Sequence, residues 1–202
     1  MCPLLETLRI EKGEIHQLSF HNERMNRSRR DCFGSTKDLD LRNFIQPEIY
    51  EERTKCRVVY RDQIEKIEYS SYALPSIRSL RLVTDDKVDY TYKSTDREAL
   101  KQLYRSRENC DDIIIVKNDL LTDTFFCNIA LWNGNQWQTP AQPLLKGTCR
   151  ASLLEEGKII EKDIRIEDLD YFSRICLFNA MISFGEIDFS FIKREKVLIV
   201  AK

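Results

Sequence analysis

Short segments of strand-like sequence, separated by polar turns, make up most of this chain. Bulky and β-branched residues recur in such segments at residues 56–60, 64–69, 78–83, 88–92 and 113–116. The last of these is continuously apolar, which is typical of a strand covered on both faces. Helical patterns are fewer, and the clearest fall at residues 20–33, 95–107 and 149–157. The sequence therefore predicts a mixed α/β fold of the α+β class.

Turn residues divide these segments. Lys12-Gly13 closes an expected hairpin near the start of the chain, and Gly34 can end the first helix in a left-handed conformation. Asn133-Gly134-Asn135 is a hairpin turn after an expected strand over 120–132. The character of the sequence changes near residues 88–94. We therefore expect two α/β domains, a reduced N-terminal domain over 1–90 and a C-terminal domain over 91–202.

Charge and cysteine content exclude several classes of protein. The 202 residues hold 32 Lys and Arg against 33 Asp and Glu, which excludes a globally basic nucleic-acid binder. No apolar run approaches the roughly 20 residues that cross a bilayer. The first residues lack a signal-peptide pattern, so a soluble, cytoplasmic protein with reduced thiols is expected. Seven cysteines without CxxC spacing and only two histidines predict no metal site.

Two sites have the residues to bind an anion. His21, Arg24 and Ser28 share one stripe of the predicted helix in a locally basic stretch. This stripe is either a solvated charged face or, if one arginine points inward, a phosphate-binding surface. Gly147-Thr148 begins another helix, where backbone amides favour anions, but the pair alone is a weak phosphate motif and an ordinary helix start explains it more simply.

Lys93 and Asp123 are the candidates for covalent and acid–base chemistry. Lys93 follows the predicted strand at 88–92, and its amine either reaches solvent or, if buried, reacts with a carbonyl. Asp123 lies in an otherwise apolar strand and needs a partner. A protonated ring nitrogen and a neighbouring arginine are both suitable. The residues alone leave these alternatives open.

Taken in order, the motifs resemble the class IV aminotransferase family, the fold-type IV enzymes that use pyridoxal phosphate. This family includes D-amino-acid and branched-chain aminotransferases and 4-amino-4-deoxychorismate lyase. Its H-x-x-R motif corresponds to His21-Asn22-Glu23-Arg24, and its T-E-x-x-x-x-N motif to T-D-T-F-F-C-N at residues 122–128. Further matches are Thr139-Pro140, L-K-G-T-C-R at residues 145–150, and Asn179-Ala180-Met181. The resemblance covers nearly the whole chain.

The resemblance implies a two-domain fold like that of D-amino-acid aminotransferase, with the cofactor cleft between the domains, and a role for each matching residue. Lys93 corresponds to the catalytic lysine that forms the internal aldimine and then moves the α-proton. The implied cofactor-binding residues are Arg24, Lys93, Asp123, Gly147, Thr148, Cys149, Asn179 and Ala180. The implied substrate-binding residues are Arg97, Ala180 and Met181. A homodimer that acts on a small amino substrate, without nucleic acid or membrane, is expected.

Three departures from the family pattern bear on activity. Asp123 replaces the usual glutamate and is one methylene shorter. Glu98 stands where aminotransferase members carry a tyrosine, which favours the lyase branch, as does Arg97 four residues after the lysine. The chain also begins at the family's Glu-Thr strand, so we expect reduced loops on the substrate side.

Three functional hypotheses follow. The first is a pyridoxal-phosphate enzyme, either a 4-amino-4-deoxychorismate-lyase-like catalyst of β-elimination or a small class IV aminotransferase. The second is a non-catalytic relative that keeps the fold as a binding or structural homodimer. The third, a nucleic-acid module that uses the basic stretch at residues 24–30, has no recognised motif and no net positive charge in its favour.

Overall fold

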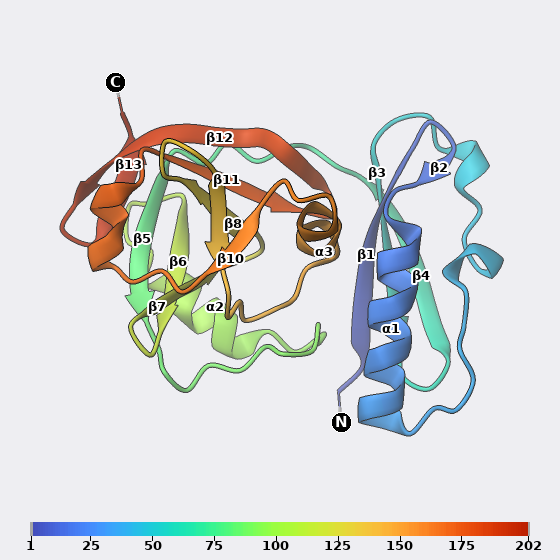
Figure 1. Cartoon of the computed structure of the whole chain (residues 1–202). Coiled ribbons are helices and arrows are strands. Elements are labelled where there is room, and N and C mark those ends of the chain that lie inside the picture. The colour runs from blue at the N-terminus through green and yellow to red at the C-terminus, as the bar shows by residue number, and fades with distance from the viewer. Residues whose placement is uncertain (1, 202) are drawn as a thin grey trace. The chain divides into compact units, whose positions relative to one another are not determined.

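The computed structural model describes residues 2–201 of the chain. It shows a mixed α/β protein with few helices and two sheets, one of four and one of nine strands, as the sequence predicts (Figure 1). The described residues form two compact units. Unit 1 takes residues 2–74 and 92–96, and unit 2 takes residues 75–91 and 97–201. No helix within residues 2–201 is long and apolar enough to cross a membrane.

Unit 1 is an antiparallel sheet in the order β2-β1-β3-β4, with one long helix packed on it. Its strands are β1 (Leu4–Glu11), β2 (Glu14–Ile15), β3 (Thr54–Tyr60) and β4 (Ile64–Ser71). The helix α1 (Leu18–Phe33) runs alongside the sheet, and two 3-10 turns follow it, η1 (Leu41–Asn43) and η2 (Pro47–Ile49) (Figure 1). The predicted hairpin and the left-handed end of the helix at Gly34, with φ 70°, are both confirmed.

One face of β1 forms the core of unit 1. Leu4, Leu8 and Ile10 are buried there and belong to the same cluster as Met25 of α1. Because alternate residues of a strand point to the same face, Glu6 lies on this apolar face too. Its side chain is completely buried. A carboxylate in such a position needs charged or hydrogen-bonded partners from the helix above it.

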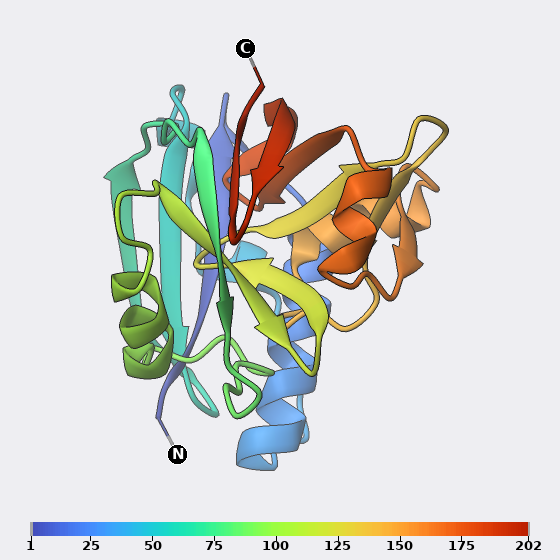
Figure 2. The same ribbon diagram turned by 90° about the vertical axis from the view of Figure 1, so that its left-hand side faces the viewer.

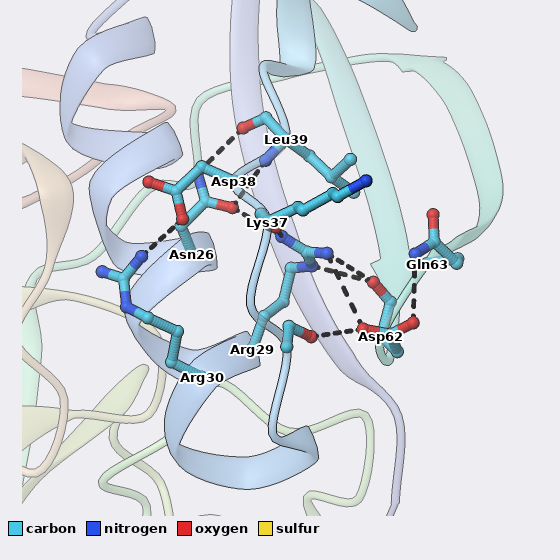
Figure 3. A network of polar contacts seen from close by, with 9 residues as sticks. Asn26, Arg29, Arg30, Lys37, Asp38, Leu39, Asp62 and Gln63 are labelled. Carbon is cyan, nitrogen blue, oxygen red and sulfur yellow. Dashed lines mark hydrogen bonds and ion pairs between the residues drawn. The ribbon is translucent and has the colours of Figure 1, made fainter.

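The basic stretch of α1 divides between core and surface. Arg27 and Arg30 are about half exposed, whereas Arg29 is 1% exposed. The Arg29 guanidinium donates to the carbonyl oxygens of Asp62 and Lys37 and to Asn26 Oδ1, at 2.7 to 2.9 Å (Figure 3). This side chain therefore ties α1 to the loop that follows it and to the β3–β4 turn.

Unit 2 is built on a nine-stranded sheet in the order β10-β9-β8-β11-β12-β13-β5-β6-β7. The strands are β5 (Ser79–Thr84), β6 (Asp112–Lys117), β7 (Leu120–Thr124), β8 (Asn128–Trp132), β9 (Trp137–Pro140), β10 (Ile160–Lys162), β11 (Arg174–Asn179), β12 (Ile182–Arg194) and β13 (Val197–Val200). The pairs β5–β6 and β9–β10 are parallel and the others are antiparallel. The 13-residue β12 pairs with β11 over residues 182–190 and with β13 over residues 191–194.

Two helices and a 3-10 turn complete unit 2 (Figure 2). Helix α2 (Glu98–Arg105) packs on β6, where Leu100 joins a cluster with Ile113 and Ile115. Helix α3 (Thr148–Glu155) packs on β11 and places Leu153 against Cys176. The turn η3 (Glu167–Tyr171) precedes β11.

Two predicted strands are wrong in detail. Residues 120–132 form two strands rather than one, because the Thr124 amide donates to the Cys127 carbonyl at 2.9 Å and closes a turn. Residues 88–92 form no strand. There the Asp85 carboxylate accepts the Val88 amide, and the Asp89 carboxylate accepts the Thr91 amide. Aspartate side chains thus take the backbone donors that a ladder would use.

Residues 75–90 group with unit 2, whereas the expected division at residue 90 places them in the N-terminal domain. The reason is strand pairing, since β5 lies between β6 and β13.

Candidate functional site

A buried ion cluster in unit 1 joins β1 to α1. Arg24 donates from Nε to Glu6 Oε1 at 2.9 Å and from Nη2 to Glu6 Oε2. His21 Nδ1 lies 2.6 Å from the same Oε2. His21 and Glu6 are completely buried and Arg24 is 8% exposed. The stripe predicted for His21, Arg24 and Ser28 therefore faces the core rather than solvent.

The charges of this cluster are set by its pairing. Burial alone would raise the pKa of Glu6, but Arg24 and His21 together lower it to about 2, so Glu6 is a carboxylate. Burial lowers the pKa of His21 despite its bond to Glu6, and the charges of Arg24 and Lys93 lower it further. A neutral imidazole that faces a carboxylate carries its proton on Nδ1. His21 is therefore a neutral Nδ1–H donor.

Lys93 lies in a segment of unit 1 that runs beside β1. The Lys93 carbonyl accepts the Leu5 amide at 2.8 Å, and Ser94 forms a bridge with Leu4. The lysine is half-buried, and its charge acts on His21. The structure thus brings Arg24 and Lys93, the two cations that the sequence singled out in this unit, to the same buried histidine.

Asp123, on β7 in unit 2, is a buried acid held by neutral donors. Its Oδ1 accepts from Asn128 Nδ2 at 2.7 Å and its Oδ2 from the Leu145 amide at 2.9 Å. Burial raises the pKa of Asp123 to about 6, against the lowering effect of these two bonds and of the Arg150 charge. A carboxylate in this position would be stabilised by a cationic hydrogen-bond donor.

The start of α3 lies next to Asp123 through Asn128. Asn128 Nδ2 donates both to Asp123 and to the Leu145 carbonyl, at 2.9 Å. Gly147 precedes the helix with no side-chain cap. A Cβ atom at Gly147 would lie 2.0 Å from Asn128 Oδ1, so a glycine is needed here to leave room for the asparagine. Thr148 and Cys149, the first helical residues, are both buried.

Asn179 organises the turn between β11 and β12. Its Oδ1 accepts the amides of Met181 and Ile182 at 2.7 and 3.0 Å, and its Nδ2 donates to the Phe126 carbonyl at 3.1 Å. Ala180 is half-buried in this turn, and Met181 is buried. The side chain of Asn179 therefore ties the 179–182 turn to the turn between β7 and β8.

Arg97 and Asp112 form a second charged group in unit 2. Arg97 donates to the Phe125 carbonyl, and its guanidinium lies 4.3 Å from the centre of the Phe125 ring. Asp112 is completely buried, and burial raises its pKa to about 6. Sequence analysis missed Asp112, although an acid directly before the apolar run at residues 113–116 is a signal for it. No metal-ligating cluster occurs among residues 2–201.

Comparison with known proteins gives the family. The amino-transferase class IV model matches residues 3–188. The chain belongs to the class IV aminotransferases. An uncharacterised protein of Haemophilus influenzae is 37% identical to this class IV aminotransferase, over 90% of the chain and 98% of that protein.

Solved structures agree with this assignment. A putative 4-amino-4-deoxychorismate lyase from Haemophilus somnus matches with a TM-score of 0.85 and 34% identity, over 91% of this chain and 98% of the other. The pyridoxal-phosphate-bound form of a hypothetical aminotransferase from Mycobacterium tuberculosis shares the fold, with a TM-score of 0.71 and 19% identity over 91% and 79% of the two chains. The fold-type IV architecture expected from the sequence is thereby confirmed.

The class IV aminotransferase family binds pyridoxal phosphate, and the residues of this chain fit that group. Arg24, Lys93 and the start of α3 are of the kinds that hold phosphate. The hydrogen-bond donors to Asp123 are uncharged amides, and the charge of Arg150 also acts on it, so a protonated ring nitrogen would be a fitting direct partner for this carboxylate. Lys93 carries a primary amine, the kind of group with which a pyridoxal aldehyde reacts.

Proposed function

We propose that this class IV aminotransferase is a pyridoxal-phosphate enzyme with Lys93 as its catalytic residue. The observation that carries the proposal is the pairing of Asp123, a buried carboxylate bonded to neutral amides. A positively charged ring nitrogen beside Asp123 would offset the free-energy cost of burying the ionised carboxylate. When bound, pyridoxal phosphate draws electrons from the α-carbon of an amino substrate.

In this proposal, different residues of the chain bind the phosphate, the ring nitrogen and the substrate, and one moves the α-proton. Arg24, with Gly147 and the amides of Thr148 and Cys149, holds the phosphate. Asp123 keeps the proton on the ring nitrogen, and the Lys93 amine takes and returns the α-proton. The turn of Asn179 and Ala180 supplies further amides for the phosphate. Arg97, Ala180 and Met181 contact the substrate.

We further propose a lyase reaction on 4-amino-4-deoxychorismate or a related amino compound, by β-elimination. The 34% identity to the Haemophilus somnus protein named for this activity supports the choice, as does Arg97 four residues after Lys93. A small aminotransferase is the second candidate, because both reactions remove the same α-proton. The two differ in their need for an acceptor: a lyase turns over without an added 2-oxo acid, and an aminotransferase does not. We expect the working form to be a cytoplasmic homodimer.

The decisive experiment is a visible absorption spectrum of the protein with pyridoxal phosphate, recorded for the wild type and for Lys93→Ala. We expect a cofactor band in the wild type that is lost in the variant, because alanine cannot bond to the aldehyde. Lys117→Ala in β6 is a matched control and should keep the band. A wild type without any band at saturating cofactor would contradict the proposal and favour the non-catalytic homodimer.

A further inference from the structure

Asn128 is a buried polar residue to which the proposed function gives no task. It lies at the start of β8 and is 7% exposed. Its Nδ2 bonds to two acceptors, Asp123 Oδ1 at 2.7 Å and the Leu145 carbonyl at 2.9 Å. A side-chain NH2 group carries two hydrogens, so one is available for each acceptor. The asparagine therefore joins two segments of unit 2, the strand β7 and the loop before α3.

Leu145 closes these contacts into a ring of hydrogen bonds. Its amide donates to Asp123 Oδ2 at 2.9 Å, while its carbonyl accepts from Asn128. Both oxygens of Asp123 are thus connected to one residue of the loop, one directly and one through the asparagine. A rotation of the carboxylate would disturb a hydrogen bond at each oxygen, so its orientation is linked to the position of the Leu145 backbone.

The same loop leads into α3 within two residues. Gly147 directly precedes Thr148, the first residue of the helix. A Cβ atom at Gly147 would lie 2.0 Å from Asn128 Oδ1, so no side chain fits between this backbone and the asparagine. Asn128 therefore meets the loop twice, by a hydrogen bond at Leu145 and by close packing at Gly147.

We propose that Asn128 is a positioning residue that couples Asp123 to the start of α3. The proposal rests on the proposed function, in which Asp123 meets the ring nitrogen and the start of α3 binds the phosphate. Asn128 does not touch the ligand in this account. It makes recognition of the ring nitrogen and recognition of the phosphate depend on each other, because neither segment can shift without the other.

An asparagine suits this task chemically. The Asn128 bond lowers the pKa of Asp123 against the effect of burial, so without it the acid would keep a proton more readily. A neutral carboxylic acid lacks the charge that a protonated ring nitrogen requires. An aspartic acid at position 128 would have the same shape, but it carries at most one hydrogen for the two acceptors.

Three ligands separate the two kinds of recognition. Pyridoxamine phosphate carries both groups, pyridoxamine lacks the phosphate, and an analogue of pyridoxamine phosphate has a CH group in place of the ring nitrogen. None of them carries an aldehyde, so a bond to Lys93 does not enter the comparison. The phosphate ratio is the dissociation constant of pyridoxamine divided by that of pyridoxamine phosphate. The ring ratio is the dissociation constant of the CH analogue divided by the same value.

We expect Asn128→Ala to lower both ratios by about fivefold or more, the lower end of typical coupling between sites. Asp123→Ala should lower the phosphate ratio as well as the ring ratio, although Asp123 does not meet the phosphate. Asn133→Ala is the matched control, because Asn133 follows the other end of β8 and its Oδ1 accepts the amides of Asn135 and Gln136 at 3.0 and 2.9 Å. Both ratios should stay unchanged in this control.

Amide hydrogen exchange provides a readout without any ligand. The direct partner of the Leu145 amide is Asp123 and not Asn128. If the ring of hydrogen bonds acts as one unit, Asn128→Ala should nevertheless speed the exchange of this amide roughly tenfold. Exchange at the wild-type rate would contradict the coupling, and Asn133→Ala should keep that rate.

The ratios distinguish the failure of the coupling from the failure of the proposed function. A fall in only one ratio in Asn128→Ala would overturn the coupling, and unchanged ratios would overturn the positioning role altogether. The proposed function stands in both cases if Asp123→Ala lowers the ring ratio. A wild type in which both ratios equal one would contradict the proposed function, and the coupling with it.

Asn128→Asp keeps the proposal testable if Asn128→Ala does not fold. The aspartic acid keeps the shape of the side chain and can serve only one of the two acceptors. A fall in both ratios in this variant supports the coupling, and a fall in one ratio or in neither contradicts it.

Discussion

Glu6 in unit 1 and Asp123 in unit 2 are both buried carboxylates, yet their pKa values move in opposite directions. Glu6 has an arginine and a histidine against it, and its pKa falls to about 2. Asp123 is hydrogen-bonded to an asparagine and a backbone amide, and its pKa rises to about 6. The comparison teaches that burial alone does not decide the state of an acid. A charged partner acts as the counter-ion of Glu6 through direct hydrogen bonds, whereas the direct hydrogen bonds of Asp123 come from neutral groups, and Arg150 lowers its pKa only through its charge.

The substitution Glu6→Ala removes one of the two acids compared here, and it should have the largest effect on the free energy of unfolding. Truncation leaves the Arg24 guanidinium buried without its counter-ion, which typically costs about 3–5 kcal/mol. Urea unfolding at pH 7 measures the change. Glu68→Ala, at an exposed ion pair of the same sheet, should cost less than about 1 kcal/mol. Equal losses in the two variants would contradict the assigned pairing.

The pH dependence of stability should have opposite signs in the two units. Glu6 has a lower pKa in the folded state, so its contribution, roughly 3 kcal/mol, is complete above about pH 4.5 and is lost as the pH falls toward 2. Asp123 has a higher pKa in the folded state. Its folded form keeps a proton that the unfolded chain releases, so stability falls by roughly 3 kcal/mol as the pH rises from about 4 to about 6.

Hydrogen exchange of individual amides separates these two effects. Between pH 4 and pH 6, corrected for intrinsic exchange rates, β7 should lose protection as the pH rises. Below pH 4, β1 should lose protection as the pH falls. Asp112, whose pKa is also raised to about 6, adds to the first effect in β6. If the protection of β1 and β7 changed in the same direction with pH, the pKa values of Glu6 and Asp123 would be shifted in the same direction, contrary to this prediction.

The substitution Gly147→Ala tests the role of Asn128, whose side-chain amide donates a hydrogen bond to Asp123. The added Cβ would lie 2.0 Å from Asn128 Oδ1, so the amide must move and its bond to Asp123 is weakened. We expect a loss of about 2 kcal/mol in stability, of the size typical for overpacking, and weaker cofactor binding. Thermal unfolding and titration with pyridoxal phosphate measure the two effects. Gly134→Ala, where a Cβ meets no atom within 4 Å although φ is 93°, should leave cofactor binding unchanged.

Asp123→Asn should have the smallest effect on stability. The substitution removes a charge that the folded state accommodates poorly, and it disturbs one of two hydrogen bonds. We expect a change within about 1 kcal/mol at pH 7, and loss of the stability slope between about pH 4 and pH 6 that Asp123 contributes. A loss as large as that of Glu6→Ala would show that Asp123 is stabilised as a carboxylate within the unit.

The sequence predicts the local features of this protein better than its long-range pairings. Lys12-Gly13, Gly34 and the turn at residues 133–135 act through neighbouring residues, and all three lie where expected. The stripe of α1 could also be predicted from helical spacing. Glu6 could not be paired with it, because the partners lie 15 and 18 residues away and meet only when α1 packs on β1.

Two other differences between the predicted and the observed strands have local causes. One comes from polar side chains that bind the backbone, and the other from an alternating sequence pattern that was not interpreted as a strand. Asp85 and Asp89 compete for backbone donors and prevent a strand at residues 88–92. The strands β12 and β13 were not predicted, although Ile187, Phe189 and Phe191 alternate with polar residues. The roles of the candidate site residues depend on a ligand, so their assignment from motifs stays a prediction.

The position of β13 affects the order in which the sheets can assemble. Unit 1 has all four strands of its sheet by Ser71, so that sheet can form early in synthesis. In unit 2, β13 comes after the other eight strands of the sheet in chain order, and it pairs with β12 on one side and with β5 on the other. Until residues 197–200 have left the ribosome, the two parts of the nine-stranded sheet have no shared ladder. Folding of unit 2 is therefore expected to wait for β13, and its open strand edges need protection until then.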